Sequence, residues 1–300
     1  MKPFEYFSPM TLAEAISFLS QYGSDARALA GGTDLLIRTK RKQWTPRAVV
    51  SLRRVPGLRD IALASRGELR IGACVTLNDL IRSPVIREHY SVLFKTASKM
   101  AGVQVRNLAT VGGNLCNASP AADTAPPLIA LNARTVIVGK NGERVVPLDE
   151  FFVDVGKSVL APDELLREIL VPRLDETMRA SYVKLEHREA MDIAIVGVGV
   201  WVKSQQSTVS SQQCEDVRIV LGAVAPTPVR AKRAEEVLRG KELTEERIRE
   251  AARVAVTESK PIDDVRGSAW YRREMVELLT RRQLMEIRSN GTRTNADERG

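Results

Sequence analysis

Ala30-Gly31-Gly32-Thr33-Asp34 and Thr110-Val111-Gly112-Gly113-Asn114 are two glycine pairs, each of which follows an apolar stretch typical of a β-strand. Paired glycines allow positive φ angles and let the backbone approach a bound group closely. Their backbone N–H groups can then surround an anion such as a pyrophosphate. One Gly-Gly pair is common in ordinary turns, but two similar loops at a domain-like separation predict one extended ligand held between two lobes.

The length and composition indicate a globular protein. The chain has 300 residues, of which 44% are hydrophobic, so it can bury one large core or two modest ones. No apolar run reaches the roughly 18 residues that a membrane span needs. The opening Met1-Lys2-Pro3-Phe4-Glu5 lacks the apolar segment of a signal peptide, so we expect a cytoplasmic protein.

The cysteines and histidines argue against a metal site in this chain. Cys74, Cys116 and Cys214 lie far apart in the sequence, whereas a zinc site or an iron–sulfur cluster needs clustered ligands. The two histidines, His89 and His187, have no ligand-spaced partners. We therefore predict no metal ligand, and we interpret Cys116 as a small apolar residue rather than a nucleophile.

The positive charge has two interpretations. A net charge of +8 and a pI of about 9.6 are compatible with nucleic-acid binding. The densest cluster, Arg38–Lys42, ends an expected helix, and aromatic residues make up only 5% and are not interleaved with the cations. The sequence therefore favours a solvated basic face, or attraction to an acidic partner subunit, over nucleic-acid binding.

The first 175 residues alternate between helix and strand signals. Thr11 and Thr76 each stand three residues before an acidic residue and are predicted to begin helices, the first of which ends at Gly23. Thr33 is placed to cap a helix after the first glycine loop. Asn141-Gly142 is the signal of a two-residue hairpin turn.

After Pro172 the pattern changes to apolar runs typical of antiparallel strands, followed by helical patterns. The predicted strands are Ser181–Glu186, Ile193–Val202 and Val217–Val224, and the predicted helices are Ala231–Leu238, Glu245–Thr257 and Ser268–Ile287. We expect an α+β chain with a domain over 1–175, made of subdomains of about 1–55 and 56–175, and a second domain over 176–287. The polar residues 288–300 are predicted to be a disordered tail. There is no GxGxxG fingerprint after a first strand, so a Rossmann unit is not expected.

Both glycine motifs resemble those of the FAD-binding medium subunit of the molybdenum hydroxylases, the family of carbon monoxide, xanthine and aldehyde dehydrogenases. The second motif matches over the whole of Arg106–Asp123, and the first over Ala30–Leu36. The opening Phe4–Pro9 and the later Asp192-Ile193-Ala194 match as well. The resemblance covers essentially residues 1 to 287 in order.

The resemblance implies a fold of the vanillyl-alcohol-oxidase (PCMH) type, in which two subdomains hold FAD and a C-terminal three-stranded antiparallel sheet packs with helices. It also implies a heterotrimer, often doubled. A small subunit carries two [2Fe–2S] clusters and a large subunit carries the molybdenum cofactor. The resemblance implies that electrons pass from the clusters to the FAD of this chain, and that neither metal belongs to it. The flavin is expected to be non-covalent, because neither loop contains a histidine.

The resemblance also implies cofactor-binding residues, and no catalytic residue of this chain's own. At the first loop, Gly31, Gly32 and Thr33 are expected to meet the pyrophosphate at a helix start. Asp34 is expected to face helix-start amides or a ribitol hydroxyl, because a carboxylate repels phosphate. The other predicted residues at the two loops and beside them are Leu29, Ala30, Leu35, Ala101, Gly102, Thr110, Gly112, Gly113 and Asn114.

The remaining predicted cofactor residues come later in the sequence. Asp123 is a candidate acceptor for sugar hydroxyls, with the alternative that it caps the following helix. Lys184 is placed near the isoalloxazine, where a cation would stabilise the anionic reduced flavin, with the alternative of a solvated strand lysine. Asp192 and Ile193 are expected beside the ring. Leu165 and Leu166 match positions near the adenine or the ring, although leucines on a helix face usually belong to the core.

Two other functions stay open at this point. A stand-alone flavoprotein oxidase of the same fold would act directly on a small substrate, and a basic binding protein would use the glycine loops only as turns. The sequence does not identify the substrate of the complex, which is expected to bind the large subunit. It also does not choose among NAD, a quinone, oxygen or a soluble carrier as the electron acceptor.

Overall fold

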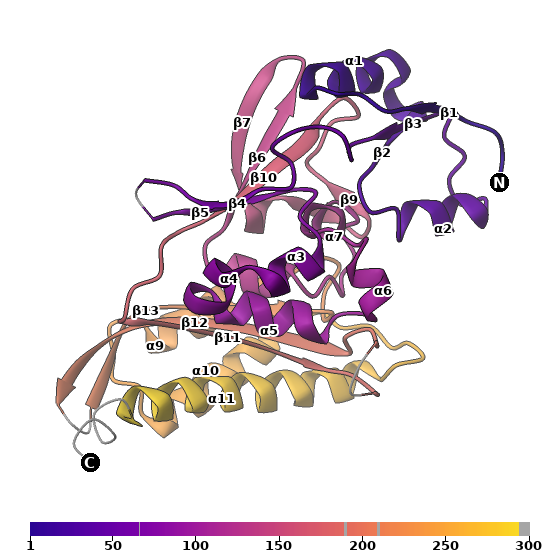
Figure 1. The fold of residues 1–300 in the computed structure, drawn as a ribbon. Helices are drawn as coiled ribbons and strands as arrows, with labels where there is room; N and C mark the ends of the chain where they lie inside the picture. Colours follow the sequence, from indigo (N-terminus) through magenta and orange to yellow (C-terminus); the bar gives the residue numbers. More distant parts are fainter. Residues whose placement is uncertain (66, 189–190, 209–210, 294–300) are drawn as a thin grey trace. The chain divides into compact units, whose positions relative to one another are not determined.

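The computed structural model describes residues 1–65, 67–188, 191–208 and 211–293 (Figure 1). Two compact units divide the chain. The first unit comprises Met1–Ser119 with Asn132–Arg173, and the second comprises Pro120–Leu131 with the residues from Leu174 onward. Pro120–Leu131 therefore groups with the C-terminal residues, although the sequence analysis assigned it to the first domain. The predicted boundary near residue 175 stays a prediction.

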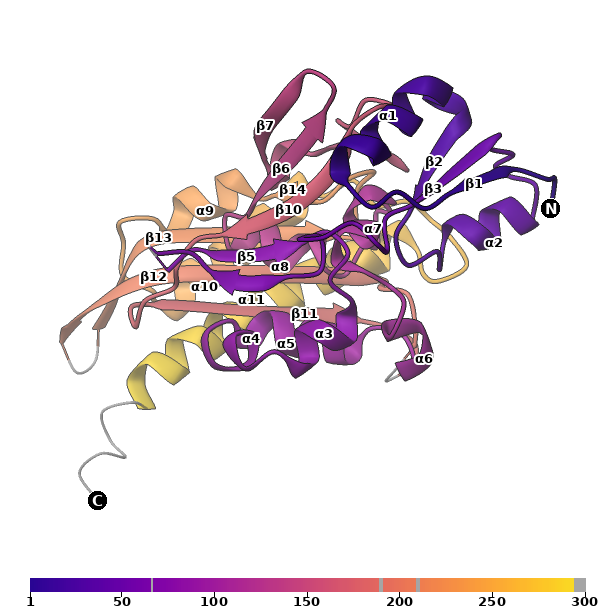
Figure 2. The ribbon, with the colours of Figure 1, turned by 45° about the horizontal axis from the view of Figure 1, so that its top comes forward.

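The N-terminal part of the first unit is a three-stranded parallel sheet between two helices (Figure 2). Alternate residues of its central strand face opposite sides: Ala48 and Val50 pack with helix α1, and Val49 packs with Leu35 of α2. Its elements are β1 (Glu5–Phe7), α1 (Leu12–Tyr22), η1 (Gly23–Asp25), β2 (Ala26–Leu29), α2 (Leu35–Lys40) and β3 (Ala48–Ser51), in the sheet order β1-β3-β2.

The helix boundaries in this part follow the sequence signals only in part. The predicted N-cap at Thr11 is confirmed, because its side chain accepts a hydrogen bond from the N–H of Glu14 at 3.2 Å. The predicted end at Gly23 is also confirmed, with a φ of 53°. The predicted cap at Thr33 is wrong: α2 begins at Leu35, and Asp34 is its N-cap residue without a side-chain hydrogen bond.

The rest of the first unit is built on a five-stranded antiparallel sheet. Its strands are β4 (Ile61–Leu63), β5 (Leu69–Gly72), β6 (Arg134–Gly139), β7 (Gly142–Pro147) and β10 (Leu165–Val171), in the order β4-β5-β10-β6-β7. The other elements are α3 (Leu77–Arg82), α4 (Pro84–His89), α5 (Ser91–Lys99), α6 (Val103–Arg106), α7 (Val111–Cys116), η2 (Leu148–Glu150), β8 (Phe152–Asp154) and β9 (Lys157–Ser158).

Three predictions can be checked in this sheet and its helices. The capping box at Thr76 is confirmed, with hydrogen bonds in both directions between Thr76 and Asp79. The predicted hairpin is confirmed, but its turn lies one residue earlier, because Gly139 pairs with Gly142. Leu165 and Leu166 lie on strand β10, so their expected place on a helix is wrong.

The second unit is a four-stranded antiparallel sheet with helices. The three predicted strands are confirmed, and a two-residue strand, β14, is added at one edge. The elements are α8 (Ala125–Ala130), β11 (Met178–Leu185), β12 (Val196–Thr208), β13 (Ser211–Gly222), β14 (Val229–Arg230), α9 (Lys232–Leu238), α10 (Glu245–Glu258) and α11 (Ala269–Arg293). Helix α11 extends through 288–293, which were predicted to be tail, and 294–300 lie outside the described residues.

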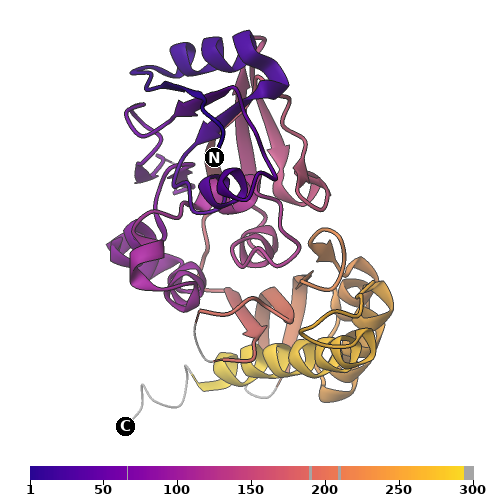
Figure 3. The ribbon, with the colours of Figure 1, turned by 90° about the vertical axis from the view of Figure 1, so that its right-hand side faces the viewer.

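Alternation along the strands gives this sheet two different faces. Val198 and Val200 of β12 belong to the buried core that includes residues of α9, α10 and α11, and Figure 3 shows these helices on one side of the sheet. Gly197 and Gly199 lie on the other face. A Cβ atom on Gly199 would stand 2.9 Å from the carbonyl oxygen of Pro126, so this glycine lets α8 pack against the strand.

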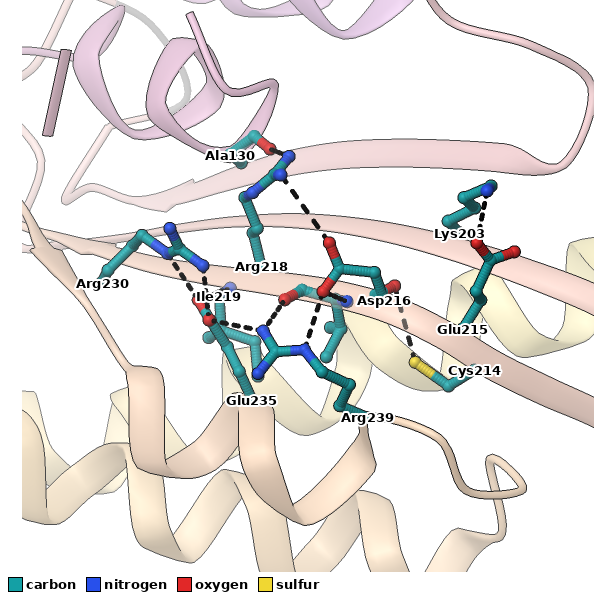
Figure 4. Close-up of polar contacts among 11 residues, drawn as sticks. Ala130, Lys203, Cys214, Glu215, Asp216, Arg218, Ile219, Arg230, Glu235 and Arg239 are labelled. Atoms are coloured by element: carbon teal, nitrogen blue, oxygen red, sulfur yellow. Dashed lines mark hydrogen bonds and ion pairs between the residues drawn. The ribbon is translucent and has the colours of Figure 1, made fainter. Parts of the chain in front are cut away.

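A charged network holds β13, β14 and α9 together at one end of the second unit (Figure 4). Glu235, whose side chain is 1% exposed, accepts hydrogen bonds from Arg230 at 3.0 and 2.7 Å and from the N–H of Ile219 at 3.1 Å. Arg239 links this carboxylate to Asp216 of β13. Because the buried carboxylate has partners on both sides, we assign this network to stability.

Candidate functional site

The first glycine loop lies against the segment that leads into the second. A Cβ atom on Gly31 would stand 2.0 Å from the carbonyl oxygen of Leu108. Gly32 has a φ of 80°, and the side chains of Leu29 and Leu36 lie over it, 2.9 and 3.1 Å from an added Cβ. The two motifs are therefore brought together within the first unit, as the sequence analysis expected of loops that share one ligand.

The backbone N–H groups of the first loop are available to a ligand. Among the residues that the structure describes, the N–H groups of Gly31, Gly32, Thr33 and Asp34 donate no hydrogen bond to a protein acceptor. The loop leads directly into α2, where helix-start amides carry partial positive charge. Asp34 is exposed and does not cap these amides, so its expected contact with them is absent. This chemistry fits an anion such as a phosphate.

The second loop differs, because the fold uses its amides. The N–H groups of Val111 and Gly112 donate to Val75 and Ala73 at 3.0 Å. Those of Gly113 and Asn114 donate to the hydroxyl and the carbonyl of Thr110, also at 3.0 Å. Thr110 is thus the N-cap of α7. The glycines of this loop let a ligand approach the backbone closely. A hydrogen bond from one of these amides to the ligand would require that amide to give up its present acceptor.

Asn117 is a residue that the sequence analysis did not select. It follows α7, and its Oδ1 atom is buried without a hydrogen-bond partner among the described residues. A buried acceptor without a donor costs free energy, so such an atom in a predicted binding motif points to a ligand that donates a hydrogen bond. The signal was its place inside the second motif, three residues after Asn114 and directly after α7.

Ala101 and Gly102 lie in the turn between α5 and α6. Ala101 has a φ of 44°. The guanidinium Nη1 of Arg106 donates to the carbonyls of Ala101, Met100 and Ser98 at 2.8, 2.9 and 3.1 Å. Arg106, which was also not selected, therefore holds this turn in place.

Leu165 and Leu166 are buried strand residues. Leu165 belongs to a core cluster with Val138 and Leu58. This packing matches the alternative interpretation of both leucines as core, and their predicted proximity to the cofactor stays a prediction.

In the second unit, Asp123 and Lys184 belong to one buried polar cluster. The ammonium Nζ of Lys184 lies 3.2 Å from the Asp123 carboxylate and 2.9 Å from the Glu186 carboxylate. The hydroxyl of Tyr182 donates to Asp123 at 2.9 Å. Asp123 does not cap α8, whose N-cap residue is Thr124 and has no side-chain cap bond. Lys184 is not a solvated strand lysine, because its side chain is 2% exposed.

Burial and pairing set the charges of this cluster. Burial raises the pKa of Asp123, although Lys184 and Tyr182 oppose this effect. Burial disfavours the charged form of Lys184, but Asp123 and Glu186 outweigh it and raise the pKa of the ammonium. The pKa of Tyr182 is raised well above its ordinary value by burial and by Asp123. Lys184 is therefore a cation at neutral pH, and Tyr182 is a neutral donor.

Asp192 and Ile193 are attached to the same cluster. The backbone carbonyl of Asp192 accepts a hydrogen bond from Lys184 at 3.1 Å. Its carboxylate accepts from the N–H of Ile193 at 2.9 Å and from that of Arg188 at 3.2 Å. The structure therefore joins three of the predicted positions, Asp123, Lys184 and Asp192.

No group of metal ligands is found in the part of the chain that the structure describes. Burial raises the pKa of Cys116 and of Cys214 to about 12 and that of Cys74 to about 11, so all three are neutral thiols near pH 7. Within the described residues, no helix is long and apolar enough to cross a membrane.

Comparison with known families decides the assignment. Residues 2–174 match the FAD binding domain in molybdopterin dehydrogenase, and residues 181–287 match the CO dehydrogenase flavoprotein C-terminal domain. The chain belongs to this family of FAD-binding dehydrogenase subunits. As a member of it, the chain is an oxidoreductase subunit with an FAD-binding domain, which confirms the predicted family and fold class.

Individual relatives support the same assignment along the whole chain. The carbon monoxide dehydrogenase medium chain of Hydrogenophaga pseudoflava is 36% identical over 281 residues, which are 94% of this chain and 96% of the relative. The xanthine dehydrogenase FAD-binding subunit of Escherichia coli O157:H7 is 32% identical and covers 94% of each chain.

Solved structures of relatives have the same fold. That of carbon monoxide dehydrogenase from H. pseudoflava superposes with a TM-score of 0.88 at 36% identity, over 94% of this chain and 96% of that one. That of quinoline 2-oxidoreductase from Pseudomonas putida 86 gives 0.89 at 28% identity, over 97% and 100%.

Proposed function

We propose that this chain is the electron-transfer subunit of a heteromeric molybdenum-containing dehydrogenase or hydroxylase. It binds FAD and passes electrons from [2Fe–2S] clusters to an external acceptor. The observation that supports this most directly is the first glycine loop, whose N–H groups have no acceptor among the described residues and lie against the second motif. The match over both family domains identifies FAD as the ligand.

The first unit fits the phosphate end of FAD. Gly31, Gly32 and Thr33 would donate backbone N–H groups to the pyrophosphate at the start of α2. The glycines of the second loop would let the backbone approach the cofactor. The buried Oδ1 of Asn117 would accept a hydrogen bond from a hydroxyl or amine of the cofactor, which would remove the cost of its present lack of a partner.

The charged cluster of the second unit suits the flavin end of FAD, because it contains a buried cation. Lys184 is a buried cation, and a cation near the flavin N1 side favours the reduced, anionic form. Its two hydrogen bonds in this structure go to Asp123 and to the carbonyl of Asp192, and it forms an ion pair with Glu186, so its effect on the flavin would be mainly electrostatic. Bound FAD supplies the redox chemistry, because it exchanges one or two electrons, and the chain needs no acid–base pair of its own.

The partners follow from the same proposal. The described part of the chain offers no metal ligand group, so the [2Fe–2S] clusters and the molybdenum cofactor would belong to a small and a large subunit. Relatives are a medium chain of carbon monoxide dehydrogenase and a medium subunit of nicotine 6-hydroxylase, which supports a heteromeric complex. We propose a dimer of heterotrimers.

Electron transfer is tested by producing the chain with and without candidate iron–sulfur and molybdenum subunits and recording visible spectra after addition of substrate. We expect the flavin absorbance to bleach only in the complete complex. Bleaching of the isolated chain by substrate would indicate a stand-alone oxidase instead. Absence of flavin from both preparations would contradict the proposal altogether.

A further inference from the structure

The ammonium group of Lys184 joins three separate segments of the second unit. It donates hydrogen bonds to the carboxylate of Asp123 at 3.2 Å and to the backbone carbonyl of Asp192 at 3.1 Å, and it forms an ion pair with the carboxylate of Glu186 at 2.9 Å. A lysine ammonium has three donor positions. Two of them are used, toward one acceptor before α8 and one in the segment that precedes β12, and the ion pair is made with a carboxylate just after β11.

In the described part of the chain, the Glu186 carboxylate makes no ion pair other than the one with Lys184. The Glu186 side chain is 9% exposed, and its buried Oε2 atom lies at ion-pair distance from Lys184 but has no hydrogen-bond partner among the described residues. A buried carboxylate is costly unless it is paired, and removing one member of such a pair is strongly unfavourable. The position of Glu186 is therefore explained by the position of Lys184.

The Asp192 carbonyl connects this pair to an exposed apolar segment. Met191 and Ile193 on either side of Asp192 are 60% and 48% exposed, so burial does not hold them in place. Hydrogen bonds of Asp192 hold them instead. Its backbone carbonyl accepts a hydrogen bond from Lys184, and its carboxylate accepts hydrogen bonds from the N–H groups of Ile193 and Arg188. Loss of the Lys184 anchor would release this segment.

We propose that Glu186 is a positioning residue that fixes Lys184 and, through it, the Asp192–Ile193 segment. This rests on the proposed function, since these residues matter to the flavin only if FAD binds beside them. The Glu186 carboxylate also offsets the charge of Lys184, and Asp123 adds a second negative charge. Glu186 thus has two separable effects: its contact with Lys184 orders the segment, and its charge lowers the potential of a nearby flavin.

The first experiment measures ordering in the apoprotein by hydrogen–deuterium exchange. Glu186→Ala is compared with Glu186→Gln, which keeps a polar oxygen on a side chain of the same length beside Lys184 but removes the negative charge. The matched control is Glu215→Ala, which removes a carboxylate from the Lys203 ion pair elsewhere on the same sheet. Amides of Val196–Val202 in β12 are the internal reference.

We expect Glu186→Ala to speed exchange in peptides that contain Arg188 and Ile193 by about tenfold relative to β12, as loss of a buried anchor predicts. Glu186→Gln should stay close to wild type, and so should Glu215→Ala. Unchanged exchange in Glu186→Ala, or an equal increase in β12, would overturn the positioning role. If Glu186→Ala does not fold, fast exchange in Glu186→Gln confined to the same peptides would overturn it as well.

The second experiment measures FAD affinity and flavin midpoint potential on the same variants. Glu186→Ala should weaken FAD binding by about tenfold. Glu186→Gln should keep the affinity and raise the potential, because one negative charge beside Lys184 is lost. Wild-type affinity and potential in both variants would overturn the inference. If the wild-type chain binds no FAD, the proposed function fails, but the exchange experiment still decides whether Glu186 orders the segment.

Discussion

The carbonyl oxygen of Leu108 lies 2.0 Å from the point that a Cβ atom on Gly31 would occupy. No side chain fits in that space, so Gly31 is needed for the contact between the two glycine motifs. The sequence analysis gave Gly31 and Gly32 the same role at a pyrophosphate. The structure separates them: Gly31 serves packing as well, whereas Gly32 provides the positive φ of the turn.

We therefore expect Gly31→Ala to destabilise the apoprotein by about 1–3 kcal/mol, the usual cost of forcing extra volume into a packed site. Thermal unfolding without added FAD measures this. Gly267→Ala is the control, because an added Cβ there makes only ordinary contacts at 3.4 and 3.5 Å. Equal stability of the Gly31 and Gly267 variants would show that the loops are not packed in this way.

Gly32→Val and Gly113→Val are expected to abolish retention of FAD by a folded chain, since a branched side chain would block approach of the phosphates. Gel filtration followed by assay of released flavin measures retention, and circular dichroism checks folding. An added side chain at either glycine would come very close to neighbouring atoms, so each variant must first be shown to fold. Stoichiometric FAD in either folded variant would contradict the assigned cradle.

Asn117→Ala should affect binding without affecting the apoprotein. The Oδ1 atom has no partner to lose and is costly when buried alone, so we expect no loss of unfolding free energy. Loss of a hydrogen bond to the cofactor should raise the Kd for FAD by about tenfold. Titration with FAD by fluorescence measures this, and unchanged affinity would indicate that Oδ1 faces no ligand group.

Lys184 and Glu186 should show strong coupling in stability. Lys184→Met leaves two carboxylates of the buried cluster without a cation, so we expect a loss of about 3–5 kcal/mol. Adding Glu186→Gln should recover part of that loss, because one of the two negative charges is removed. Chemical unfolding of the two single variants and the double variant measures the coupling, and strictly additive losses would argue against the pair. If FAD binds, its potential should fall in Lys184→Met.

The cysteines give a prediction on pH. The raised pKa of Cys116 and Cys214, about 12, and of Cys74, about 11, means that the thiol form predominates at pH 8 and that thiolate appears only as the pH rises toward those values. Because the thiolate is the nucleophile, the native chain should react very slowly with a disulfide reagent at pH 8. The denatured chain should titrate three thiols. Rapid labelling of the native chain at pH 8 would contradict this.

Local signals predicted much of the fold. Thr76 and Asp79 form the predicted capping box because both partners lie within one helical turn. Strand β12 was predicted from its own residues, because Ile193–Val202 is a short apolar run. Leu165 and Leu166 were misplaced, because a short apolar run fits a buried strand as well as a helix.

The site was predicted less completely, because its details depend on contacts between distant segments. The amides of Val111 and Gly112 are occupied by residues 73–75, and nothing within the motif itself indicates this. Lys184 finds its partner Asp123 61 residues away. Glu186 and Asn117 emerged only from burial and from unpaired atoms, which the sequence does not show.

The most direct test of the central claim is the amount of FAD released by denaturing the chain after it is purified with its candidate partner subunits. The proposed cofactor site predicts close to one FAD per chain, with the yellow flavin spectrum before denaturation. Absence of releasable FAD, in a folded complex that holds its iron–sulfur and molybdenum groups, would contradict the assignment of both glycine loops.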